Sequence, residues 1–194
     1  MRGHCRFFIS VMLVHMAAFA FMGCARSPDA ERSAARGSMT AAIAAGADRY
    51  AAADFRLAQS FWYTAESRMT GRKYKEARRY YINAKTSFEK ALAGVEAGRK
   101  AVATATSAAL QGLENDWKNL KAQAGSASKN KKKHWAADEK TIAEGLTAAR
   151  DMIAADPAGA AVKIKEIGSV IQNWTAVFEG ATAAPTKPYT PGKG

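Results

Sequence analysis

From about residue 40 onwards the apolar residues of this chain recur every three or four positions, which is the spacing of an amphipathic α-helix. No stretch shows the two-residue alternation of a half-buried β-strand. We therefore predict an all-α protein, built from elongated antiparallel helical hairpins or a helical bundle.

Two apolar stripes predict the first hairpin. The first consists of Phe55, Ala58, Trp62, Ala65 and Met69, and the second of Tyr74, Ala77, Tyr81, Ala84, Phe88, Ala91 and Val95. Gly71 lies between them and is a usual residue at a helix end. Because only a few residues join the stripes, the two helices should pack as antiparallel neighbours.

The second half of the chain predicts another hairpin. Helical spacing continues to about Ala124, and Gly98 and Gly112 are the positions at which the helix would break, if it breaks. A helix running unbroken from Tyr74 would be roughly 75 Å long. After the loop GSASKNKKKH, two further stripes flank AADPAGA, where Pro157 suits a first helical position. They consist of Ile142, Leu146, Ala149 and Ile153, and of Ile164, Ile167, Ile171, Trp174 and Phe178.

The N-terminus has the layout of a secretory signal. The segment MRGHCR carries Arg2 and Arg6 without an acidic residue, and an apolar run of about fifteen residues follows it. Crossing a membrane needs roughly twenty apolar residues, so an uncleaved anchor is the second choice. We expect the chain to be exported.

The end of the apolar run, Phe21 to Cys24, resembles the bacterial lipobox, in which a small residue precedes a cysteine that is acylated and becomes the new N-terminus. The resemblance implies a signal peptide at residues 1–23 and lipid attachment at Cys24, and the absence of Asp just after the cysteine favours the outer membrane, with the domain facing the periplasm. The alternative is ordinary cleavage after Ala25, which would discard Cys24. The other cysteine, Cys5, lies in the signal, so neither a disulfide nor thiolate catalysis is expected.

Composition divides the rest of the chain into three parts. Residues 24–39 are small and polar, with a proline and a glycine, which is typical of a flexible tether. Residues 40–180 form the predicted helical domain. Residues 181–194 are rich in Pro, Gly and Lys, which cannot bury a core, so we expect a disordered tail.

Residues around the first turn carry a further resemblance. The segment GRKYKEARRYYINA resembles the core of a tetratricopeptide repeat. Residues 41–92, above all AGADRYAAADF and YKEARRYYINA, are similar to a family of uncharacterised bacterial envelope lipoproteins built on an alanine-rich helical hairpin, a domain of unknown function. This resemblance implies a location in the cell envelope and brings no catalytic residues.

The chain is basic, with a formal net charge of +12, which permits anionic partners. A cluster of lysines in the predicted loop, Lys129, Lys131, Lys132 and Lys133, is a candidate site for an anionic envelope polymer. A solvated loop between helices is the more frequent explanation of such a run. Nucleic acid is not an expected partner, because the chain carries an export signal and regularly spaced core aromatics.

Aromatic residues suggest a second candidate surface. Trp62, Tyr63, Tyr80 and Tyr81 would line a groove for a peptide or helix, although core packing is the default explanation of aromatics at helical spacing. Tyr63 and Tyr80 fall off the main stripes and are therefore the candidates for a partner surface.

The residues that catalysis requires are not seen. The sequence shows no paired carboxylates, no phosphate-binding loop and no metal-ligand spacing, and His134 beside the lysine run is the one histidine outside the signal. We expect neither an enzyme nor a cofactor or metal. The sequence favours a non-catalytic helical scaffold or adaptor for an envelope protein partner, held to the membrane by its N-terminal lipid; the alternative is a polyanion-binding periplasmic protein that uses residues 129–133.

Overall fold

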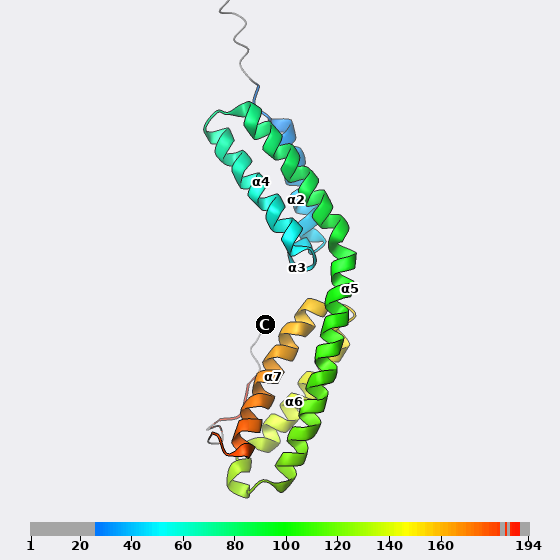
Figure 1. Ribbon diagram of the computed structural model, residues 1–194, viewed down its shortest axis with the longest axis vertical. Coiled ribbons are helices and arrows are strands. Elements are labelled where there is room, and N and C mark those ends of the chain that lie inside the picture. Colours follow the sequence, from blue (N-terminus) through cyan, green and yellow to red (C-terminus); the bar gives the residue numbers. More distant parts are fainter. Residues whose placement is uncertain (1–25, 183–184, 186, 191–194) are drawn as a thin grey trace, which may run out of the picture. The chain divides into compact units, whose positions relative to one another are not determined.

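The computed structural model describes residues 26–182, 185 and 187–190 of the chain (Figure 1). Its elements are α2 (Asp29–Ala44), α3 (Ala47–Tyr50), α4 (Ala52–Thr70), α5 (Tyr74–Ser126), the 3₁₀ helix η1 (Lys129–Lys132), α6 (Trp135–Met152) and α7 (Pro157–Glu179). The described residues contain no strand, so the all-α prediction is confirmed. Contacts divide the chain into two compact units, and α5 contributes to both.

Unit 1 comprises the described residues up to Ala44 together with residues 53–91, and it is a bundle of α2, α4 and the first part of α5. The rings of Phe55 and Phe88 pack 5.5 Å apart between centroids, and those of Trp62 and Tyr81 also 5.5 Å. These pairs confirm the antiparallel hairpin of α4 and α5. Fully buried alanines alternate with the aromatics along the stripes and allow the backbones to approach closely: Ala58, Ala65, Ala77 and Ala84.

Helix α2 corrects the prediction of a flexible tether over residues 24–39, because α2 begins at Asp29. Its buried side is made of alanine, with Ala35 and Ala42 fully buried, so it lacks the large apolar residues that reveal a helix in a sequence. Asp29 and Glu31 lie in the first turn, where negative charge is favourable. An ion pair of 2.8 Å from Glu31 to Arg78 holds α2 against α5.

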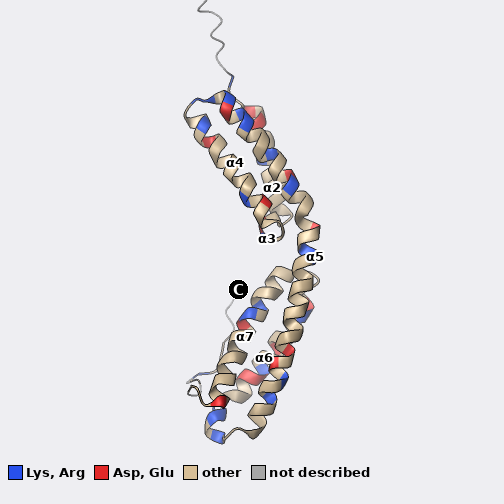
Figure 2. Cartoon of the chain, viewed as in Figure 1, with Lys and Arg blue, Asp and Glu red and all other residues tan. Residues whose placement is uncertain are grey.

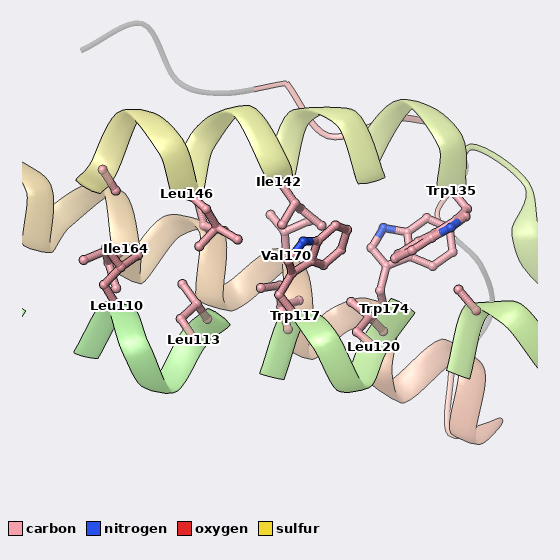
Figure 3. Close-up of a cluster of buried hydrophobic side chains, with 14 of the residues drawn as sticks. Leu110, Leu113, Trp117, Leu120, Trp135, Ile142, Leu146, Ile164, Val170 and Trp174 are labelled. Carbon is pink, nitrogen blue, oxygen red and sulfur yellow. The ribbon is translucent and has the colours of Figure 1, made fainter. Parts of the chain in front are cut away.

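Unit 2 comprises residues 45–52 and the described residues from Leu92 onwards. The rest of α5 packs with α6 and α7 around one apolar cluster, shown in Figure 3. Its largest fully buried side chains include Trp174, Leu120, Ile142 and Ile171. The predicted second hairpin is thus present as α6 and α7, and α5 runs through Gly98 and Gly112 as one helix of 53 residues.

The C-terminal segment differs from the expected disordered tail at residues 187–190. Helix α7 ends normally at Gly180, whose φ of 86° is left-handed. Farther on, the backbone N–H of Tyr189 donates a hydrogen bond of 2.7 Å to Oδ1 of Asp138, and the Tyr189 side chain packs against the core of unit 2. Composition alone missed this contact, because it depends on one buried acceptor far away in the sequence.

The predicted signal peptide and Cys24 lie outside the described residues. Among the helices that the structure describes, none combines the length and apolar character needed to cross a membrane.

Candidate protein-interaction surface

The middle of α4 is free of charge, although a quarter of the chain is charged. Residues 57–65, LAQSFWYTA, contain no acidic or basic side chain, and 24% of all residues are charged. Figure 2 shows this stretch as a tan part of α4, with charged positions nearer the ends of the helix. Trp62 faces the core, so several of its neighbours point to solvent.

We define the α4 outer face as Leu57, Ser60, Tyr63 and Thr64. The side chains of Leu57 and Tyr63 are 48% and 66% exposed. Between them, the hydroxyl of Ser60 donates to the carbonyl of Leu57 at 2.7 Å, and that of Thr64 donates to the carbonyl of Ser60 at 2.8 Å. Because both hydroxyl hydrogens are already bonded to the helix itself, covering this face costs little desolvation.

Tyr80, the other predicted partner residue, lies elsewhere on unit 1. Its ring packs against Phe61 with centroids 6.4 Å apart, under the guanidinium of Arg79 at 5.4 Å. Each residue turns a helix by about 100°, so Phe61 and Tyr63 point to nearly opposite sides of α4. The structure therefore does not bring Tyr63 and Tyr80 together: Tyr63 belongs to the α4 outer face, and half-buried Tyr80 lies in the seam between α4 and α5.

A polar cluster that sequence reasoning missed fixes the orientation of α4. Arg32 on α2 donates to Glu66 on α4 from Nε at 2.8 Å and from Nη2 at 2.6 Å. The hydroxyl of fully buried Tyr81 on α5 donates to the same carboxylate at 2.8 Å. One carboxylate thus joins all three helices of unit 1.

Electrostatics in this cluster favour the ionised carboxylate. Burial opposes ionisation of Glu66, but the hydrogen bonds from Arg32 and Tyr81 outweigh it and lower the pKa of Glu66. Burial and the bond to Glu66 raise the pKa of Tyr81, and the same carboxylate raises the pKa of Arg32. Each group is held in its usual ionisation state at neutral pH, which suits a structural link better than proton transfer.

The lysine cluster of residues 129–133 is divided between two roles. Lys131 Nζ donates to the carbonyl of Phe178 at 3.0 Å, and Lys132 Nζ donates to that of Gly125 at 3.4 Å. These carbonyls belong to the last turns of α7 and α5, where such groups lack helical partners and positive charge is favourable. Lys129 and Lys133 are exposed. The structure thus presents two exposed ammonium groups rather than a block of four.

Two of the shallow cavities of unit 2 lie against α5. One of about 400 Å³ lies between α5 and α7, with Asp116, Asn119 and Gln172 among its lining residues. The other, about 470 Å³, is lined partly by Arg99 and Arg150. Both arginines are already engaged: Arg150 pairs with Glu114, and Arg99 donates to the carbonyl of Ala155. No group of three or more His, Cys, Asp or Glu side chains in the described part of the chain is placed to hold a metal ion.

Comparisons with known proteins identify no relative of this chain. No protein family, curated protein or solved structure matches this chain. The resemblance of residues 41–92 to uncharacterised lipoproteins, and that of the first hairpin to a tetratricopeptide repeat, therefore stay predictions. A function for this chain is therefore inferred from its own surfaces.

Proposed function

We propose that this protein is a membrane-anchored envelope lipoprotein and a non-catalytic helical scaffold or adaptor, which offers the α4 outer face to a protein partner. The observation that carries this proposal is the uncharged middle of α4, where the side chains of Leu57 and Tyr63 are exposed. Unit 1 also exposes Ile43 by 52% and Ile82 by 49%. Leu57 and Tyr63 share one face of α4, and contiguous exposed apolar surface is typical of an interaction site.

The shape of the face favours a helical partner. Small residues, Ser60 and Thr64, lie between the larger Leu57 and Tyr63, which allows a second helix to approach closely. Such a helix would present an apolar stripe at intervals of three and four residues. Exposed Arg56, one residue before the face, favours an acidic side chain at the matching end of the partner.

The anchor supports this role by keeping unit 1 close to the membrane. Only five residue steps separate Cys24 from the first residue of α2, Asp29. An extended chain spans at most about 3.6 Å per residue, so α2 would begin within about 18 Å of an acylated Cys24. Each buried methylene of the acyl chains contributes about 0.8 kcal/mol to membrane binding. A partner of the α4 outer face would then be met near the membrane surface.

The test is site-specific photo-crosslinking in intact cells. A photoreactive residue replaces Tyr63 in one strain and Leu57 in another. The matched control is Val162 on α7, whose exposure of 60% is close to that of Tyr63. We expect the same discrete adduct from positions 57 and 63 and none from position 162.

Combining the crosslinker with Cys24→Ala tests the anchor in the same assay. The chain should leave the membrane fraction and lose the adduct, whereas Cys5→Ala, within the predicted signal, should change neither. Adducts of equal intensity from all three positions, or no adduct from positions 57 and 63, would contradict the proposed surface. A chain with Cys24→Ala that stays in the membrane would contradict the lipid anchor.

A further inference from the structure

Unit 2 buries a carboxylate beside a group of aromatic rings. The Asp138 side chain on α6 is 1% exposed, and its Oδ2 accepts a hydrogen bond of 2.9 Å from Trp174 Nε1. The Trp174 ring packs against Trp135 with centroids 5.2 Å apart (Figure 3). Its centroid lies 5.4 Å from that of Phe178. A buried carboxylate is costly unless its acceptor atoms are bonded, so both oxygens need donors.

The second donor comes from the C-terminal segment. The backbone N–H of Tyr189 reaches Oδ1 of Asp138 at 2.7 Å, and the Tyr189 side chain is half-buried against the core. Its neighbours Lys187, Pro188 and Thr190 are exposed. The segment 187–190 is thus held to unit 2 mainly through one residue, which offers one backbone donor and one aromatic ring.

Proline before the tyrosine suits this mode of binding. Pro188 lacks an N–H and fixes its own φ, so the Tyr189 N–H is the donor presented beside the ring. The acceptor is equally well defined, because Trp174 bonds to Oδ2 of Asp138 and leaves Oδ1 for the segment. A charged acceptor strengthens the backbone hydrogen bond, and the core of unit 2 provides the apolar surface against which the tyrosine side chain packs.

We propose that Asp138, oriented by its hydrogen bond from Trp174 and lying beside the apolar core of unit 2, forms a binding site for an extended proline–tyrosine peptide segment of a partner protein. Residues 187–190 fill this site in the free chain and are displaced when the partner binds. The site rests on the proposed adaptor role for the existence of a partner. It lies on unit 2, however, and is tested separately from the α4 outer face on unit 1.

The experiment uses the full chain in detergent, with a specific protease site in place of residues 181–184. The protein is cut after it has folded, and the released C-terminal peptide is removed by dialysis. The probe is the fluorescent synthetic peptide TKPYTPGKG, which copies residues 186–194. We expect the cut protein to bind the probe at least about tenfold more tightly than the uncut chain, because the attached segment competes at high effective concentration.

Two matched peptides test the chemistry. In the first, the tyrosine is N-methylated, which removes the N–H but keeps the ring, and we expect at least about a tenfold loss of affinity. The second, GSPYSG, keeps only the proline–tyrosine pair, and we expect it to displace the probe, whereas GSGYSG should not.

Three results would overturn the proposal. The first is no binding to cut protein whose circular dichroism and melting temperature match those of the uncut chain. The second is equal affinity for the N-methylated peptide. The third is failure of GSPYSG to displace the probe, which would mean that the site serves only the chain's own segment. Crosslinking at positions 57 and 63 is independent of all three, so failure of the adaptor role is recognised separately.

Discussion

Gly98 is required by a close approach of two backbone segments. A Cβ atom added at this position would lie 1.7 Å from the carbonyl oxygen of Tyr50, at the end of α3. The sequence marked Gly98 only as a point where a helix would break, whereas the structure shows an unbroken helix that needs a residue without a side chain there. Gly112, in the same helix, has no atom within 4 Å of an added Cβ.

The two glycines should therefore respond to alanine in opposite directions. Gly98→Ala should lower the free energy of unfolding by more than about 1 kcal/mol, because backbone atoms must move apart. Gly112→Ala should raise it by about 0.5 to 1 kcal/mol, since alanine is the better helix former. Chemical denaturation followed by circular dichroism measures both. Stabilisation by Gly98→Ala would show that Tyr50 does not approach α5 as described.

Asp138 is a charged residue at a position where the helical pattern predicts an apolar one. It occupies an inward position of α6 between Trp135 and Ile142, at steps of three and four. A carboxylate on an apolar stripe is a detectable signal of a buried hydrogen-bonded site. Its partners are not detectable, because Trp174 and Tyr189 lie 36 and 51 residues away in the sequence.

At the scale of elements, the loop lysines stabilise helix ends. Lys131 and Lys132 bond to carbonyls in the last turns of α7 and α5. Neither helix has a basic residue in its own last turn. The loop thus supplies from outside the positive charge that favours a helix C-terminus.

Substitution of the lysines in pairs separates a structural from a binding role. Replacing Lys131 and Lys132 by Gln should lower the free energy of unfolding by about 0.5 to 1 kcal/mol per lysine, because each interaction with a helix terminus is lost. Replacing Lys129 and Lys133 by Gln should leave stability within about 0.5 kcal/mol of the unsubstituted chain. Thermal unfolding in low salt is the measurement. Equal effects of the two pairs would contradict the assigned bonds.

At the scale of the whole molecule, each unit has its own acid-sensitive carboxylate. In unit 1, hydrogen bonds from Arg32 and Tyr81 lower the pKa of Glu66 despite its burial. In unit 2, the backbone N–H of Gly159, the Tyr50 hydroxyl and Arg49 lower the pKa of Asp156. A carboxylate with a lowered pKa stabilises the fold above its ordinary pKa, and this contribution is lost as the pH falls through the lowered value.

Glu66→Gln should therefore make unit 1 less sensitive to acid. The ordinary pKa of a glutamate side chain is 4.5. As the pH falls below about 4.5, unit 1 of the unsubstituted chain should lose protection against hydrogen exchange, and unit 1 of the variant should lose less over the same range. At neutral pH the variant should be the less stable protein, because the charged bond to Arg32 is absent. Hydrogen exchange resolved by segment measures both units separately. Unit 2 should be unchanged in this variant, and a change spread equally over both units would contradict the assignment.

Local residue order was sufficient to determine the class and spacing of the helices. The apolar stripes of α4, α5, α6 and α7 predicted two hairpins, because side-chain period and burial are properties of consecutive residues. The secretory layout and Cys24 are local patterns too, and they still support only a proposal. Helix α2 escaped prediction because its buried positions hold alanine, Ala35 and Ala42, rather than large apolar residues.

Only the tertiary structure decided which residues meet. It separated Tyr63 from Tyr80, placed Lys131 and Lys132 at helix ends, joined Arg32 to Glu66 and Tyr81, and brought the C-terminal segment to Asp138. Each of these depends on how a helix is rotated about its axis and on contacts between distant parts of the chain. Periodicity shows which side of a helix is buried. Packing between helices determines which polar atoms of two different helices lie opposite each other.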